Sequence, residues 1–444
     1  MPAPYARQRS PVELTATGDC RGAVSNRYLE CDLPSYVGNP ALRWLRALFV
    51  SAAVLMPVTD AAALWDDKLE LFIAESVTYD DNVFRISSRA DPVAALGTPS
   101  KGDTYTTTSP GFNFDIPLSR QRFVGGVKWN YTRYNRFTVL DFDGHEGRAV
   151  WRWQAGNDLS GQVGYSETLA LESLANSRAG VLTGTPNSLE TQRAFFDATY
   201  EATPRWRLRG EASRLDQDNS LAARKVNNII IEGGGLAVSY VTPAKNQVGL
   251  GARVEEGRYP NRPDLAANPF VDAYRQHNVD VIADYTITAH SRVNARAGWV
   301  SRSYEQLSQS DFQEGTYRFT YEWQPTAKLG VSAIARREIS PLDDTYSSFV
   351  LLTGVALNPT LRLTEKLSAA VNLDYSSRDY LVDPSLLVVP SRTDWVRTAA
   401  LKFSYRPLRS LTVEMTLLYQ TRSSTFPLAD YEDTAANLGV RLGF

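Results

Sequence analysis

The sequence predicts an all-β protein, a transmembrane up-and-down antiparallel β-barrel of about 18 strands with short periplasmic turns and longer outer loops. From Leu64 onward, apolar and polar residues alternate in successive segments, and a period of two belongs to strands with one apolar face. The connections between these segments are short and long in turn. No stretch after Ala63 is apolar enough to form a membrane-spanning helix.

The start of the chain carries the pattern of an exported protein. Arg43 and Arg46 precede an apolar run from Ala47 to Met56, and the small residues Ala61-Ala62-Ala63 follow it. A positive region, a short apolar region and a small-residue cleavage site form a secretory signal peptide in this order. We therefore expect residues 41–63 to be a signal peptide that is cleaved after Ala63.

The two remaining parts differ in character. We expect residues 64–444 to form a single outer-membrane barrel. Residues 1–40 are polar and do not fit a signal peptide, so we expect them to be a misannotated or extended N-terminus. Both cysteines, Cys20 and Cys31, lie in this first part, so the sequence predicts neither a disulfide nor a cysteine metal site in the barrel.

The predicted strands are separated by seventeen connections. Six of the short ones contain a proline, which favours tight turns and is excluded from central strands. Short turns are expected at Pro117–Arg120, Gly156–Asp158, Ala202–Pro204, Thr242–Asn246, Ala289–Ser291, Pro325–Ala327, Asn358–Thr364 and Arg406–Arg409. Long loops are expected at Ser87–Gly102, Thr138–Glu146, Glu172–Leu189, Gln217–Arg224, Pro260–Asp272, Glu305–Phe312, Ser340–Thr345, Leu381–Arg392 and Ser423–Tyr431. With eight short turns and nine long loops, the strand count is even and both termini lie on the periplasmic side.

Aromatic residues gather beside the short turns. Such rings favour the headgroup level of a bilayer, so we expect a periplasmic girdle that faces lipid. Its members are Tyr200, Trp206, Tyr240, Tyr285, Trp323, Tyr405 and Phe444. The alternative is simple hydrophobic packing at the strand ends.

The other face of the alternating strands carries charges of both signs. The residues that we expect to line the lumen are Arg152, Arg207, Arg209, Glu211, Asp280, Asp284, Arg296, Arg318, Glu322, Asp374, Lys402, Glu414 and Arg441. A strongly anion-selective pore would be dominated by one sign, so mixed charges favour a hydrated, weakly selective or sugar-conducting passage. The alternative is that the charges only pair across strands and solvate the wall.

The final segment, from Ala436 to Phe444, alternates regularly and ends on a free phenylalanine. In this respect it resembles bacterial outer-membrane barrels, whose assembly machinery reads the last strand. We therefore expect the lipid bilayer and the barrel-assembly machinery as partners. The formal net charge of −2 offers no basic patch for nucleic acid.

The sequence predicts no catalytic set, cofactor or metal. We place His145 in a loop, His277 near an outer strand end and His290 in a turn, and none lies in a hydrolase motif. The loop Asp141–Glu146 is too short for an EF-hand, and we interpret it as a solvated loop. Asp80 and Asp81 are expected to point to opposite faces of a strand.

Two stretches go beyond general barrel character. The first leads from Leu64 through Tyr79-Asp80-Asp81-Asn82-Val83-Phe84-Arg85, and the second runs from Asp103 through Phe112-Asn113-Phe114-Asp115 to Phe123. With them, residues 64–444 resemble the EpsL-type outer-membrane proteins, a β-barrel porin family of exopolysaccharide clusters associated with exosortase and PEP-CTERM systems. The resemblance implies a conduit for an exopolysaccharide, with periplasmic polysaccharide-export proteins as partners. It implies no catalytic residues.

We therefore expect a channel that takes part in exopolysaccharide biosynthesis and secretion and passes the polymer passively. A general or small-solute porin for oligosaccharides is the first alternative. A barrel enzyme that acts on lipid or polymer is the second, and we expect the chain not to be an enzyme.

Overall fold

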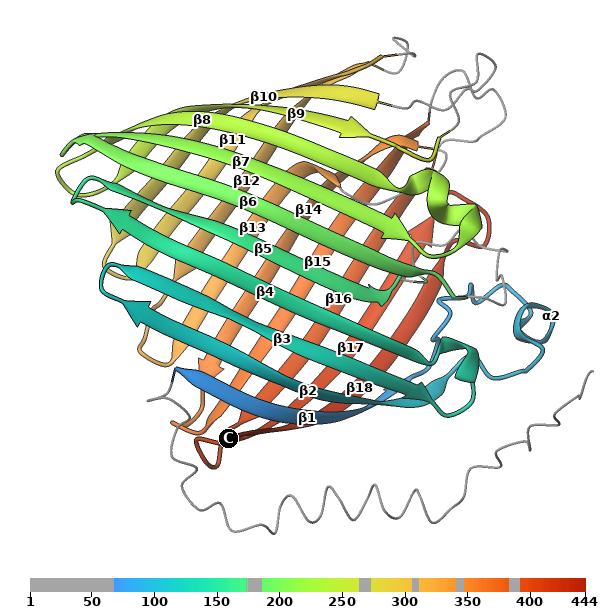
Figure 1. The fold of residues 1–444 in the computed structure, drawn as a ribbon. Coiled ribbons are helices and arrows are strands. Elements are labelled where there is room, and N and C mark those ends of the chain that lie inside the picture. The colour runs from blue at the N-terminus through green and yellow to red at the C-terminus, as the bar shows by residue number, and fades with distance from the viewer. Residues whose placement is uncertain are drawn as a thin grey trace, which may run out of the picture. The chain divides into compact units, whose positions relative to one another are not determined.

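The computed structural model describes residues 68–172, 174, 186–262, 273–305, 311–340, 347–382 and 392–444. They form one sheet of 18 strands in which every strand pairs antiparallel with the next along the chain, and β1 pairs with β18 (Figure 1). The predicted antiparallel barrel is confirmed. The expected signal peptide and residues 1–40 lie outside the described residues.

The strands are 12 to 16 residues long, enough to cross a bilayer at a tilt. Their bounds are β1 Leu69–Asp80, β2 Asp103–Leu118, β3 Gln121–Tyr134, β4 Phe142–Ala155, β5 Leu159–Leu171, β6 Ser188–Thr203, β7 Trp206–Asn219, β8 Ile229–Val241, β9 Gln247–Arg258, β10 Ala273–Thr288, β11 Ser291–Tyr304, β12 Phe312–Trp323, β13 Leu329–Ser340, β14 Ser347–Arg362, β15 Leu367–Val382, β16 Arg392–Tyr405, β17 Leu411–Ser424 and β18 Tyr431–Gly443.

In the described residues, helices are confined to the connections. They are α2 (Pro92–Leu96) and two 3₁₀ turns, η1 (Thr138–Leu140) and η3 (Ala222–Asn227). Asp91 caps α2 by accepting a hydrogen bond from the amide of Val93. None of the helices in the described part of the chain has the length and apolar character of a membrane span.

The two ends of the barrel differ. Between β2 and β3, and between every later even-numbered strand and the next, the connection has two to five residues, and the C-terminus lies at this end. The longer connections lie at the other end, where α2 projects beyond the sheet (Figure 1). There, Val83 is buried with Phe137 and Leu140, so the first long connection packs against the β3–β4 connection. The predicted order of short turns and long loops is confirmed.

The seam between the first and last strands closes the barrel. β1 and β18 are paired from Phe72 and Gly443 at one end to Asp80 and Ala435 at the other. The amide of Phe444 extends this ladder by donating to the carbonyl of Leu71 at 2.8 Å. Because a closed sheet has no free edge, every strand has two neighbours for its backbone groups.

Three local predictions were wrong. The expected loop Thr138–Glu146 ends early, because β4 starts at Phe142, so His145 lies in a strand. The expected turn Asn358–Thr364 begins late, because β14 runs to Arg362. Proline has no N–H to donate to a neighbouring strand. Pro359 is tolerated within β14 because it is paired with β13 only, and the ladder with β15 skips this position.

The third error concerns Asp80 and Asp81, which were expected to diverge. β1 ends at Asp80, and Asp81 no longer follows the alternation of the strand. Carboxylate oxygens of Asp80, Asp81 and Asp433 come within 4.8 Å of one another. The physical reason is that successive side chains point to opposite faces only where the backbone is extended.

Candidate functional site

The interior of the barrel is identified by contacts that skip a strand. Arg253 on β9 reaches Glu211 on β7 at 2.6 Å, across Gly235 of the intervening β8. Arg336 on β13 likewise reaches Asp374 on β15 at 2.8 Å. Side chains on strands two apart converge only on the concave face of a curved sheet. The charged face is therefore the interior wall.

The convex face is apolar and exposed. On β7 and β8 this face carries Leu208 and Val238, which are paired in register. Their side chains point away from the face that carries Arg207 and Ser239. Large apolar side chains exposed on many strands form a surface that needs lipid rather than water around it.

The seven aromatic residues of the expected girdle all lie on this convex face, in or directly after strand ends beside short connections. Trp206 and Tyr240 pack edge to face, with ring centroids 5.4 Å apart. Arg205 donates to the hydroxyl of Tyr240 at 2.8 Å. An aromatic body in an apolar zone with a polar tip toward water is the arrangement that suits a membrane interface.

All thirteen residues of the expected lumen lining lie on the concave face of their strands. The pairings that place them are those of β3 with β4, of β7 with β6 and β8, of β11 with β10 and β12, and of each strand from β14 to β17 with the next. They are Arg152, Arg207, Arg209, Glu211, Asp280, Asp284, Arg296, Arg318, Glu322, Asp374, Lys402, Glu414 and Arg441.

Most of these charges are joined to a charge of opposite sign. Within the set itself, Lys402 pairs with Glu414 at 2.9 Å. The other pairs with N···O distances up to 3.1 Å are Arg207–Glu201, Glu211–Arg253, Asp284–Arg292, Arg318–Glu338, Asp374–Arg336 and Arg441–Glu70. Arg209 is 3.9 Å from both Asp197 and Glu211. The wall is thus strongly polar while its charges largely cancel locally.

Four members of the set behave differently. Among the described residues, no ion pair or hydrogen bond joins Arg152, Asp280, Arg296 or Glu322 to another side chain. Arg296 lies opposite Arg318 in register, and like charges that face each other directly repel.

Several partners in these pairs were not singled out in the sequence. Glu70, Arg253, Arg292, Arg336 and Glu338 all complete pairs named above. Strand parity was available as a signal for Glu70 and Arg253, because each lies between two apolar neighbours. The pairing itself was not, since it depends on register between strands.

Near the outer end, interior-facing side chains are buried. Asp394, which is 0% exposed, lies between Arg392 and Arg422, and the two guanidinium groups cover the rings of Tyr380 and Tyr431. This part of the wall is packed.

A second packed group lies on β10 and β11. Arg302 donates to the side-chain carbonyl of Gln276 at 2.6 and 2.9 Å and covers the ring of Tyr274. All three side chains are buried. These packed groups therefore fill space along the inner side of the wall near the outer end.

Among the described residues, His145 belongs to a hydrogen-bonded group of side chains on the outside of the barrel. His145 lies on the convex face, and its Nε2 is 2.9 Å from Glu167, which also accepts from the hydroxyl of Tyr165 at 2.7 Å. No serine or cysteine of the described chain is bonded to His145. This group has a base and an orienting carboxylate but lacks a nucleophile.

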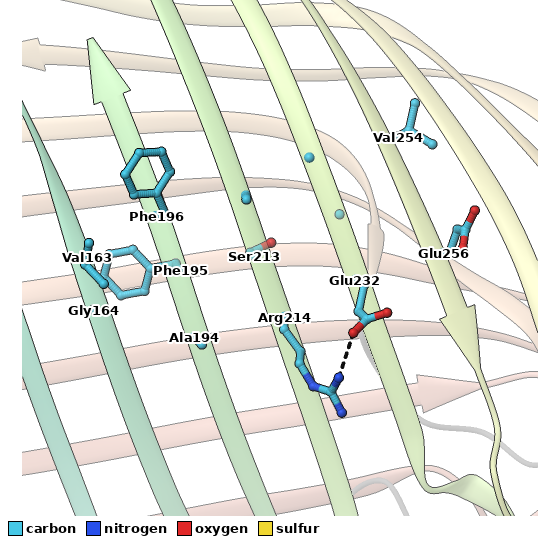
Figure 2. Close-up of a pocket in the computed structure, with 13 residues that line it drawn as sticks. Val163, Gly164, Ala194, Phe195, Phe196, Ser213, Arg214, Glu232, Val254 and Glu256 are labelled. Carbon is cyan, nitrogen blue, oxygen red and sulfur yellow. Dashed lines mark hydrogen bonds and ion pairs between the residues drawn. The ribbon is translucent and has the colours of Figure 1, made fainter.

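A hollow of about 690 Å³ lies on the convex face, where small residues of β6 to β8 leave space. Val163, Phe196 and Val254 border it, and Figure 2 shows Arg214 and Glu232 reaching toward each other at its edge, 2.6 Å apart. It faces outward and so is separate from the interior wall.

Comparison with known proteins gave one family match. Residues 277–444 match the family model described as "Putative beta-barrel porin 2". The comparison with curated proteins found no match.

Solved structures of several outer-membrane channels are similar in outline. OpdK of Pseudomonas aeruginosa, solved with vanillate, is 9% identical, with a TM-score of 0.46 and coverage of 85% of this chain and 99% of that chain. A BenF-like porin from Pseudomonas fluorescens Pf-5 is 10% identical, with a TM-score of 0.46 and coverage of 85% and 98%. DcaP of Acinetobacter baumannii is 14% identical, with a TM-score of 0.40 and coverage of 85% and 96%. Values this low say nothing about the solute that the present barrel takes.

The closed 18-stranded sheet, its apolar convex face and its charged interior agree with the family match over residues 277–444. Only helices and closed barrels satisfy their backbone hydrogen bonds within a bilayer. The chain is a β-barrel of the bacterial outer membrane, and its residues 277–444 match a porin family.

Proposed function

We propose that this barrel is a passive channel for uncharged or weakly charged hydrophilic solutes, and that its cargo is the polymer of an exopolysaccharide system. The observation that carries the proposal is the pairing of charges on the interior wall, such as Lys402 with Glu414 and Arg318 with Glu338. A wall of this kind is wetted but presents little net field to select an ion.

Sugar chemistry suits such a wall. Hydroxyl groups can exchange hydrogen bonds with carboxylates and guanidinium groups along the whole interior, and each contact is weak enough to release. The likeness of residues 64–444 to EpsL-type proteins supports a polymer as cargo.

A small-solute porin is the second candidate, and the packed outer end favours it. Buried groups around Asp394 and Arg302 take up space near the outer end of the wall. A narrowed outer opening fits oligosaccharides more easily than a long polymer.

Two measurements separate these functions. Deletion of the gene in the native host, with secreted polymer quantified, should abolish or strongly reduce exopolysaccharide in the medium while intracellular polymer rises. Normal secretion in the deletion strain would rule out the polymer as cargo. Purified barrel in planar bilayers should show ion conductance that neutral oligosaccharides block from either side, and a barrel without conductance would contradict both candidates.

A further inference from the structure

The outer end of the barrel seam holds a cluster of acidic side chains that the channel function does not use. Asp80 ends β1, Asp81 follows it, and Asp433 lies on β18. One carboxylate oxygen of each lies within 4.8 Å of the others. Asp80 and Asp433 are buried, with Asp433 0% exposed, and Asp81 is partly exposed.

The nearby cation is Arg85, in the connection after β1. Burial works against its charge, but the carboxylates of Asp80 and Asp433 outweigh this and raise the pKa of the guanidinium above its usual range. Arg85 adopts φ 55°, a left-handed conformation that is unusual for a residue with a side chain. The backbone is thus held in a strained shape that brings the guanidinium to the carboxylates.

Arg85 cannot satisfy the whole cluster. Its Nη1 carries two hydrogens but lies 2.9 Å from each oxygen of Asp80, 2.5 Å from the carbonyl of Asn82 and 3.0 Å from Oδ1 of Asp433. Apart from this 3.0 Å ion pair with Arg85, neither carboxylate oxygen of Asp433 has a hydrogen-bond partner among the described residues. A fully buried carboxylate in this condition is costly unless another positive charge completes it.

The charge balance indicates what is missing. When all three carboxylates are ionised, they and the one guanidinium leave two negative charges, which one divalent cation neutralises. Oxygens that bind Ca²⁺ lie about 2.3–2.6 Å from it, so a shared ion would place them no more than roughly 5 Å apart. Mg²⁺ demands a more regular shell and gives up water reluctantly, whereas Ca²⁺ accepts irregular carboxylate sets.

We propose that Asp80, Asp81 and Asp433 bind one Ca²⁺ that fastens the outer end of the barrel seam. The partly exposed Asp81 gives the ion a route from solvent, and water or backbone oxygens complete its shell. The site links residues about 350 positions apart in sequence and continues the β1–β18 ladder.

The backbone around the cluster already ties the two segments together. The amide of Asp81 donates to the carbonyl of Thr434 at 3.1 Å, and the amide of Thr434 donates to the Asp81 carboxylate at 2.8 Å. Asn82 donates to the carbonyl of Glu432 at 2.9 Å. These bonds hold the segment after β1 against β18 and fix the Asp81 carboxylate beside it.

Calcium binding is tested with the barrel refolded in detergent and freed of metal with EDTA. Equilibrium dialysis against ⁴⁵Ca²⁺ should give one ion per chain. Because affinity follows the number of charged ligands, Asp433→Asn and Asp81→Asn should each weaken binding by about tenfold or more. Asp430→Asn is the matched control, since this acid lies in the same segment and pairs with the exposed Arg89 instead. No binding at millimolar Ca²⁺, or equal binding by all variants, would overturn the proposal.

Thermal unfolding gives an independent readout. In EDTA, Asp433→Asn should be at least as stable as the unsubstituted barrel, because it removes an uncompensated buried carboxylate. In Ca²⁺ the order should reverse. If Asp433 served only as a partner for Arg85, the variant would be less stable in both conditions. If stability instead followed pH and ignored Ca²⁺, a proton shared by Asp80 and Asp433 would replace the metal. If Asp433→Asn does not fold, the same comparison of stability in EDTA and in Ca²⁺ can be made with Asp81→Asn, which lies just after the end of β1.

Discussion

The residue type at some positions of the interior wall is restricted by how closely neighbouring strands approach each other. Gly298 on β11 lies opposite Asp280 on β10, whose side chain is buried. A Cβ atom at position 298 would collide with the carbonyl oxygen of Val279 and with the carboxylate of Asp280. Backbone cannot give way as a flexible side chain can, so this position requires glycine.

Replacing Gly298 with alanine should therefore destabilise the barrel by about 1–3 kcal/mol, the usual cost of inserting a methyl group into a filled space. Urea unfolding in lipid vesicles measures the change. Gly210→Ala is the matched control, because a Cβ there would lie 3.7 Å from Leu236 and meet nothing closer. Equal stability of the two variants would show that the β10–β11 contact is looser than described.

Ion pairs are also a residue-scale property of the wall, and they should govern selectivity. Glu414→Gln leaves Lys402 without its partner on a half-exposed part of the interior, so permeation should shift toward anions. The reversal potential under a KCl gradient reports this shift. Glu256→Gln alters a convex-face carboxylate and should leave the potential unchanged. A shift of the same size in both variants would contradict the assignment of the two faces.

At the scale of elements, the last strand has the most demanding position. β18 pairs with β17, its neighbour in the sequence, and also with β1, which lies at the opposite end of the described sequence. Phe444 is 52% exposed on the convex face and contributes a backbone hydrogen bond to Leu71. Its ring therefore adds little to the folded barrel, and we propose that it serves recognition during assembly.

Phe444→Ala should accordingly reduce the amount of folded barrel in the outer membrane of cells, scored by heat-modifiable mobility, while the purified variant still refolds in detergent. Tyr405→Ala removes an exposed ring at the same end of the barrel and should accumulate close to normal levels. If both variants accumulate equally, the terminal ring carries no assembly signal.

At the scale of the whole molecule, the barrel combines an apolar outside with an inside whose charges cancel in pairs. The same alternation produces both surfaces, because each strand presents its odd and even positions to opposite faces. The outer end adds packed groups around Asp394 and Arg302 and the carboxylates of the seam. A hydrated passage with a reinforced outer end is the result.

Alternation and loop lengths were enough to predict the fold from the sequence. A period of two is a local property of each strand, so it can be recognised without knowing which strands are neighbours. The run from Trp206 to Ser213 is an example. Strand ends were predicted less well, because Pro359 and His145 lie in strands where local signals favoured a turn and a loop. Tertiary pairing overrides such signals when a neighbouring strand satisfies the backbone.

The sequence by itself determined the closed antiparallel barrel and the polar and apolar sides of its strands. Only the tertiary structure decided which charges meet, as with Arg253 and Glu211 across Gly235, and that Asp80 and Asp81 converge on Asp433. The reason is that register and closure depend on every strand together, whereas alternation depends on each strand alone.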